Sequence, residues 1–262
     1  MTSFEGYSLT GKVAVVTGSS SGIGAATALL MAQRGANVTI HGRRTDKLEE
    51  IANQLEEASG NRPYVVVGDI EDSDVRADLI NGTINHFGRL DVLCNNAGWM
   101  KIGGMDQTEV DDLRTMLEVH IVAPFELCKL AMSELIKNKG NIIMTSSICS
   151  LIGFPSLVAY SAAKAGCDNL MRSLAGEFAA QGVRLNCVNP GPVATDLLRN
   201  EDEFLTALSS SDTTPPTPLG RFALAREVAE LISFLASDAG AMIHGGTHAI
   251  DGGITAFIKM PS

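Results

Sequence analysis

The sequence predicts an α/β protein with a doubly wound, seven-stranded parallel sheet and helices on both faces. Seven short apolar runs alternate along the chain with longer amphipathic stretches. Several runs are continuous Val, Ile and Leu, as in strands that are buried on both faces. The alternation predicts parallel βαβ units with right-handed crossovers. The 262 residues, 45% of them hydrophobic, are enough for one large domain of this kind.

The expected elements alternate in order along the chain. The strands are predicted at residues 12–17, 37–41, 63–68, 90–94, 141–146, 183–188 and 247–250. The helices are predicted at residues 24–34, 46–58, 73–86, 110–138, 161–181 and 225–237. No internal repeat and no linker divides the chain, so we expect a single domain spanning residues 1–262.

One segment breaks this pattern. Residues 209–218 contain three prolines among serines and threonines, and cannot hold a helix or a central strand. Long loops in compact domains often carry function, so this segment is either a flexible surface loop or part of a lid. We expect a substrate lid at about residues 192–222.

Composition excludes several classes of protein. A formal net charge of −10 argues against a general nucleic-acid binder, which needs a basic patch. Five widely spaced cysteines without a Cys-x-x-Cys pair predict reduced thiols. No histidine arrangement typical of a metal site is present, and we expect no bound metal. Without an evident signal sequence or an apolar run of eighteen residues, we expect a cytoplasmic protein without a membrane span.

The first predicted strand runs into a glycine-rich turn. Gly18, Gly22 and Gly24 stand in Thr-Gly-Ser-Ser-Ser-Gly-Ile-Gly, and a helical pattern follows at once. Such glycines let backbone N–H groups approach a pyrophosphate at a helix N-terminus. The turn lacks the Gly-Lys-Ser/Thr of a P-loop. Its place between strand and helix favours cofactor binding over a simple tight connection.

A tyrosine and a lysine stand four residues apart further along the chain. Tyr160 and Lys164 would share one helix face, and Ser147 precedes them by thirteen residues. An ammonium beside a phenol lowers its pKa and prepares it to exchange a proton with an alcohol or carbonyl oxygen. Alone, this spacing is weak evidence, since a packed Tyr and a solvated Lys produce it too.

Taken together, these motifs resemble the short-chain dehydrogenase/reductase family in its compact single-domain form. The resemblance covers essentially the whole chain and implies a Rossmann-type fold. It is carried by the glycine turn, by Asn95-Asn96-Ala97-Gly98, by Ser147, Tyr160 and Lys164, by Asn189-Pro190-Gly191 with Thr195, and by Asp251-Gly252-Gly253.

The resemblance implies roles for individual residues. Tyr160 would be the general acid in reduction and the base in oxidation, Lys164 would lower its pKa and hold the nicotinamide ribose, and Ser147 would bind the substrate oxygen. Asp69 would contact the adenine ring, although a cap at a strand end is an alternative. Asn95 and Gly98 would hold the end of the fourth strand against the cofactor. The expected cofactor-binding residues are Gly18, Ser20, Ser21, Gly22, Ile23, Gly24, Arg43, Arg44, Asp69, Ile70, Asn96, Ala97, Gly98, Tyr160, Lys164, Pro190, Gly191, Val193 and Thr195.

The end of the second strand predicts the cofactor. An acidic residue there would bind the ribose hydroxyls of NAD, but the sequence reads Ile40-His41-Gly42-Arg43-Arg44. Guanidinium groups form charge-assisted bonds with phosphate. NADP(H) is therefore favoured, NAD(H) is possible, and Arg43 is predicted to be the main contact of the 2′-phosphate.

One position departs from the family pattern. His120 stands where the family usually has an Asn that bends the helix and lets a backbone carbonyl bind a relay water. Pro124 still removes a backbone donor and could relax the helix. His120 is either a working substitute, able to shuttle protons itself, or a residue that slows the proton relay.

The predicted function is NADP(H)-dependent hydride transfer to or from a small or medium-sized apolar ketone or secondary alcohol. The alternative is a cofactor-sensing binding protein of low turnover. An apolar pocket would be built from residues 149–154, 99–104 and the lid, including Trp99, Met100, Leu151, Ile152, Phe154, Leu197 and Phe204. By resemblance, a homotetramer or homodimer would form through the long helices at residues 117–138 and 161–181.

Overall fold

The computed structural model describes residues 7–195 and 217–256. Its centre is a seven-stranded sheet in the order β3-β2-β1-β4-β5-β6-β9, in which every neighbouring pair is parallel. The predicted doubly wound parallel sheet is therefore confirmed. Its strands are β1 (Val13–Val16), β2 (Asn37–Gly42), β3 (Tyr64–Val67), β4 (Val92–Asn95), β5 (Asn141–Thr145), β6 (Arg184–Pro190) and β9 (Thr247–Ile250).

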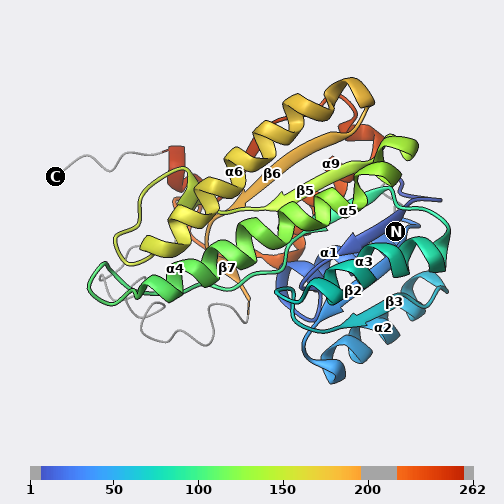
Figure 1. Cartoon of the computed structure of the whole chain (residues 1–262), viewed down its shortest axis with the longest axis horizontal. Helices are drawn as coiled ribbons and strands as arrows, with labels where there is room; N and C mark the ends of the chain where they lie inside the picture. Colours follow the sequence, from blue (N-terminus) through green and yellow to red (C-terminus); the bar gives the residue numbers. More distant parts are fainter. Residues whose placement is uncertain (1–6, 196–216, 257–262) are drawn as a thin grey trace.

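Helices cover both faces of this sheet (Figure 1). The helices are α1 (Gly22–Gln33), α2 (Thr45–Ser59), α3 (Ser73–Phe87), α4 (Val110–Leu117), α5 (Ala123–Asn138), α6 (Val158–Phe178) and α9 (Ala225–Ala236). On one face, α3, α5 and α6 pack on a core that includes Val15 of β1. On the other, α1, α2 and α9 pack on a core that includes Ala14 and Val16. Because successive strand residues point to opposite faces, the continuous apolar runs feed both cores.

The helix predicted at residues 110–138 is interrupted in its middle. Helix α4 ends at Leu117, Glu118–Val122 form a π-helix, and α5 begins at Ala123. Across the break the Ala123 N–H donates to the Glu118 carbonyl, five residues back. Pro124 has no N–H to give to the His120 carbonyl, which lies four residues before it. The relaxation expected from Pro124 is thus present as a π-turn that contains His120.

Two further differences bear on the site. Helix α6 begins at Val158 rather than at residue 161, so Tyr160 and Lys164 lie within one continuous helix. Beyond the main sheet, β7 (Val193–Ala194) pairs in parallel with β8 (Ala223–Leu224). This pair was not predicted, and it connects the two ends of the proposed lid segment.

The expected lid lies mostly outside the described residues. Of the segment 192–222, residues 196–216 are not described, and the predicted pocket residues Leu197 and Phe204 fall among them. Within the described part of the chain, no helix combines the length and apolar character needed to cross a membrane.

Candidate active site

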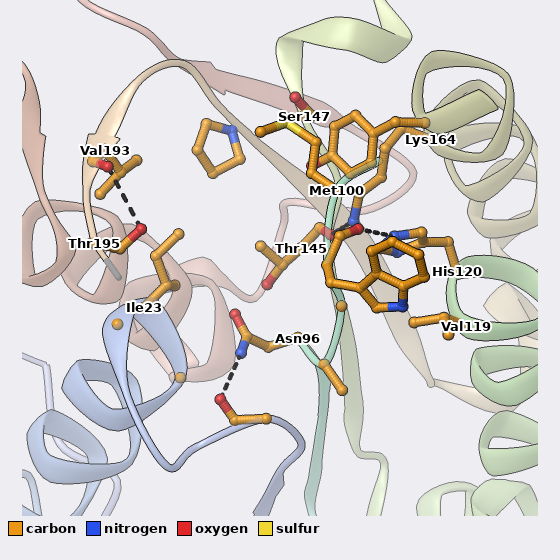
Figure 2. A pocket seen from close by; sticks show the side chains of 18 of the residues that line it. Ile23, Asn96, Met100, Val119, His120, Thr145, Ser147, Lys164, Val193 and Thr195 are labelled. Atoms are coloured by element: carbon orange, nitrogen blue, oxygen red, sulfur yellow. Dashed lines mark hydrogen bonds between the residues drawn. The ribbon is translucent and has the colours of Figure 1, made fainter. Parts of the chain in front are cut away.

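A cavity of about 520 Å³ opens at the carboxyl ends of the strands and joins the glycine turn to the catalytic residues. Ligands of doubly wound folds bind at this edge, and the volume is ordinary for a small-molecule site. The glycine turn, Arg43, Asp69 and Asn96 line one part, and Ser147, Tyr160, Lys164 and His120 line another. Figure 2 shows Ser147, Lys164 and His120 across the cavity from Ile23 and Thr195. Every residue predicted to bind the cofactor or act in catalysis lines this cavity.

The glycine turn is packed too tightly for side chains. Gly18 has φ +66°, and a Cβ there would lie 2.7 Å from the Ala97 Cα. A Cβ on Gly24 would overlap the Gly18 carbonyl and the Asn96 amide. Gly22 also has a positive φ and begins α1. The turn therefore brings backbone close to the helix N-terminus, as phosphate binding requires.

His41 accepts two hydrogen bonds from the backbone of the glycine turn, a role that was not predicted from the sequence. Its Nδ1 accepts a hydrogen bond from the Gly18 N–H at 3.2 Å, and its carbonyl accepts one from the Ser19 N–H at 2.8 Å. The imidazole is buried, and burial lowers its pKa to about 4, against a smaller opposing effect of the Gly68 carbonyl. A neutral ring is required, because only an unprotonated Nδ1 can accept from Gly18.

The two arginines after β2 make different contacts. The Arg43 guanidinium forms an exposed ion pair with Asp69 at 3.4 Å. The Arg44 guanidinium donates to the Ser21 hydroxyl at 2.8 Å and lies 3.4 Å from that of Ser20. Asp69 also accepts from the Glu71 N–H at 3.2 Å, so it does cap the turn after β3 as well as lining the cavity.

The prediction for Asn95 is wrong. Its side chain is buried, donates to the Cys128 sulfur of α5 at 3.6 Å and does not line the cavity. Asn96 instead connects β4 to the glycine turn, with its Nδ2 3.0 Å from the Thr17 carbonyl and 3.3 Å from that of Gly18. Successive strand residues point to opposite faces, so only one of the two asparagines can face the cofactor side.

Tyr160, Lys164 and Ser147 meet at the other part of the cavity. All three are buried. The Lys164 ammonium donates to the Thr145 carbonyl at 2.7 Å and lies 5.5 Å from the centre of the Tyr160 ring. Ser147 begins a 3₁₀ turn, Ile148–Ser150, and its hydroxyl accepts from the Cys149 N–H at 3.2 Å.

The pKa of Tyr160 is raised in this structure, whereas the sequence analysis expected it to be lowered. Burial raises the pKa of the phenol above its ordinary value, and the nearby Cys149 thiol acts in the same direction, while the Ser147 side chain opposes them. Burial also lowers the pKa of the Lys164 ammonium. Helical spacing predicted the pair correctly, but desolvation outweighs the charge effect that the spacing suggested.

His120 faces the catalytic group from the π-helix. Its Nε2 donates to the Trp99 carbonyl at 2.9 Å, and its ring meets the Tyr160 ring edge to face, with centroids 5.4 Å apart. Burial, followed by the charge of Lys164, lowers the pKa of His120 well below its ordinary value. The side chain is therefore neutral near neutral pH, which disfavours a shuttle that requires the imidazolium.

The remaining walls are mostly apolar. Trp99, Met100 and Phe154 line the cavity as predicted, together with Cys149 and Leu157. Leu151 and Ile152 do not line it, because their side chains are 42% and 37% exposed on the surface. The Thr145 hydroxyl also lines the cavity, and among the described residues no group bonds to it.

Comparison with known proteins agrees with this geometry. A family model described as enoyl-(acyl carrier protein) reductase matches residues 18–255. The chain is 40% identical to cis-4-hydroxycyclohexanecarboxylate dehydrogenase of Sinomonas cyclohexanicum, over 94% of this chain and 97% of the relative. It is 35% identical to glucose 1-dehydrogenase of Gluconobacter oxydans, over 94% and 93% of the two chains.

A solved structure is similar over the same extent. L-sorbose reductase from Gluconobacter frateurii, complexed with NADPH and L-sorbose, superposes with a TM-score of 0.89, at 29% identity, over 96% of this chain and 99% of the other. The extent of these matches and the matching fold leave one conclusion: the chain belongs to the short-chain dehydrogenase/reductase family of oxidoreductases.

Proposed function

We propose that this protein is an NADP(H)-dependent oxidoreductase that transfers hydride between the nicotinamide and a small or medium-sized apolar ketone or secondary alcohol. The observation that carries this proposal is the single cavity, which joins the glycine turn to Ser147, Tyr160 and Lys164. A phosphate cradle and a proton-transfer group therefore face one common space, as hydride transfer coupled to proton transfer requires.

The residues present fit a dinucleotide with a 2′-phosphate. The glycine turn excludes Cβ atoms beside the N-terminus of α1, which favours a pyrophosphate. Arg43 and Arg44 bring two guanidinium groups to the end of β2. β2 has no carboxylate there that would bind the ribose hydroxyls and repel a 2′-phosphate. The NADPH bound to the similar L-sorbose reductase supports the same choice.

The chain's own residues account for the proton. When bound, NADPH supplies the hydride. The Ser147 hydroxyl would hold the substrate carbonyl oxygen, and Tyr160 would donate the proton to it. The raised pKa keeps the phenol protonated at neutral pH, ready to act as an acid. The Lys164 ammonium, 5.5 Å from the ring centre, would then stabilise the phenolate that remains.

The walls favour an apolar substrate. Trp99, Met100, Phe154 and Leu157 surround the catalytic side of the cavity and belong to, or pack against, a small separate hydrophobic cluster. No convergent guanidinium marks a carboxylate there among the described residues, although Lys101 lies nearby and is paired with Asp112 at 3.4 Å. A cyclic or branched ketone suits such walls better than a polyhydroxylated sugar.

A panel of substrates read at the nicotinamide absorbance tests this proposal. Cyclohexanone, 4-oxocyclohexanecarboxylate, ethyl acetoacetate and L-sorbose would each be offered with NADPH and with NADH. We expect oxidation of NADPH with cyclohexanone and ethyl acetoacetate, little with the charged 4-oxocyclohexanecarboxylate or with L-sorbose, and a preference for NADPH over NADH. Binding of NADPH, seen by its fluorescence, without turnover of any ketone would favour the alternative of a cofactor-sensing binding protein.

His120 stands at the position where the family usually has the asparagine of the proton relay. Its backbone supports a working relay, since Pro124 leaves the His120 carbonyl without its usual helical donor, whatever the side chain is. We therefore propose that His120 is a tolerated substitute. The variant His120→Asn tests this: an equal or lower rate agrees with the proposal, and a large gain in kcat would show that the histidine impairs the relay.

Assembly into a homotetramer or homodimer is part of the proposal. Exposed apolar side chains follow the α4–α5 region and the start of α6, which lie on the same face of the molecule in Figure 1. Phe125 is 49% exposed, and Leu113, Leu117, Val122 and Val158 are also exposed. A second copy would cover them. Light scattering on a sizing column should give an oligomer that Phe125→Glu weakens. The five buried free thiols agree with a cytoplasmic location.

A further inference from the structure

A buried carboxylate lies one helical turn beyond Lys164 and takes no part in the mechanism above. Asp168 is 2% exposed. It follows Lys164 by four residues on α6, just as Lys164 follows Tyr160. The three side chains therefore share one stripe of the helix, which faces the carboxyl ends of β5 and β6. A carboxyl group so deeply buried is rare unless it is paired or hydrogen-bonded.

Asp168 makes its hydrogen bonds to two other segments. Its Oδ2 accepts from the Ser150 hydroxyl of the 3₁₀ turn at 2.6 Å. The Nδ2 of Asn189, on β6, lies 3.0 Å from Oδ2 and 3.2 Å from Oδ1. Asn189 Nδ2 also lies 2.9 Å from the Ser150 hydroxyl oxygen. One carboxylate thus connects the 3₁₀ turn, α6 and β6.

The same groups hold the backbone of Ser147. The Ser147 carbonyl accepts from Asn189 Nδ2 at 3.2 Å and lies 2.7 Å from the Ser150 hydroxyl. The Ser150 N–H also donates to it, at 3.1 Å. These bonds fix the peptide that presents the Ser147 hydroxyl to the cavity. On the other side, Asn189 is followed directly by Pro190 and Gly191, which line the same cavity.

We propose that Asp168, acting through Ser150 and Asn189, is a positioning residue for Ser147. The buried Asp168 carboxylate orients the hydrogen bonds of Ser150 and Asn189. These bonds in turn hold the 3₁₀ turn that follows Ser147 and positions its hydroxyl. This inference rests on the proposed function only for its catalytic consequence, because the positioning itself is a property of the folded chain.

The variant Asp168→Asn isolates this role. An asparagine keeps the shape of the side chain, but one of its two terminal atoms becomes a donor. The Asn189 Nδ2 lies against both carboxylate oxygens of Asp168, so an amide in either orientation places a donor against this donor. The turn should loosen while the surrounding core stays packed. Thr83→Val, which removes a buried hydroxyl that contacts Thr39 at 2.7 Å far from the site, is the matched control.

Hydrogen exchange measures the positioning without any substrate. The amides of Ser150, Leu151 and Ile152 donate to the carbonyls of Ser147 and Ile148, so their exchange reports opening of the turn. In Asp168→Asn we expect these amides to exchange at least about tenfold faster, with α2 unchanged, and no such change in Thr83→Val. Unchanged exchange in the turn of the folded variant would overturn the proposal, as would acceleration spread evenly over the protein.

A kinetic cycle tests the consequence for catalysis. With the ketone that the panel shows to be reduced fastest, Asp168→Asn should lower kcat/KM about tenfold in the wild-type background and little in Ser147→Ala, because both changes act through one hydroxyl. The NADPH dissociation constant should stay within about twofold. Equal losses in both backgrounds would contradict action through Ser147. A panel without turnover would count against the proposed function, and hydrogen exchange would then decide the positioning role alone.

Discussion

Replacing Arg43 by alanine should reduce the affinity for NADPH and leave that for NADH nearly unchanged. A charge-assisted hydrogen bond to a phosphate contributes about 1.5–3 kcal/mol. Arg43 must first give up its exposed ion pair with Asp69, which contributes up to about 1 kcal/mol. The difference, about 0.5–3 kcal/mol, corresponds to a loss of about 2- to 160-fold in NADPH affinity. The loss should shrink at high salt, because the side chain is 72% exposed.

Fluorescence titration measures both dissociation constants without a substrate. Lys47→Ala is the control, since Lys47 is a nearby exposed cation that pairs with Glu50 at 2.9 Å and does not line the cavity. Arg44→Ala provides the comparison, because Arg44 is already held by Ser21. A loss below twofold for Arg43→Ala, or an equal loss for NADH, would refute the assignment. A larger loss for Arg44→Ala would transfer the main phosphate contact to Arg44.

Three further predictions concern the catalytic side and the glycine turn. Tyr160→Phe should abolish detectable turnover of the ketone panel while NADPH still binds with its normal dissociation constant; retained turnover would exclude Tyr160 as the acid. Gly98→Ala should lower the free energy of unfolding by about 1–3 kcal/mol, because a Cβ there overlaps His120; chemical denaturation should show the loss relieved in the double variant with His120→Ala, and an undiminished loss would contradict the clash. His41 stays neutral when folded but binds a proton when unfolded, so stability should fall as pH drops from 6.5 to 4, by up to about 3 kcal/mol. His41→Asn should flatten this fall in a pH series of denaturation curves, and an unchanged slope would show that other groups cause it.

Local patterns in the sequence predicted the fold and most of the site. The glycine turn could be predicted from the sequence because its function depends on residues that are close together in the chain. The pairing of Tyr160 with Lys164 could be predicted because a helix fixes the distance between residues four positions apart. The carboxyl ends of parallel strands then bring these local motifs to one edge, which explains why the glycine turn, Tyr160 and Lys164 line one cavity.

What the sequence could not predict depends on burial and distant contacts. The raised pKa of Tyr160 follows from desolvation, which the spacing to Lys164 does not report. The bond between His41 and Gly18 joins residues 23 positions apart, and the only signal was a histidine near the end of a predicted strand. Asn95 failed for a related reason: without the register of β4, two adjacent asparagines could not be assigned to opposite faces.

The π-turn at Glu118–Val122 has a consequence for the phase of the long helix that contains it. A turn closed five residues back holds one residue more than an α-helical turn, and each residue advances a helix by about 100°. The face that α5 presents to the sheet is therefore rotated relative to that of α4, by about the angle of one residue. Deleting a single residue here would restore α-helical continuity but rotate α5 and its buried Leu127 and Leu135 out of register with the core. The π-helix that contains His120 thus determines how the buried face of α5 is oriented relative to that of α4.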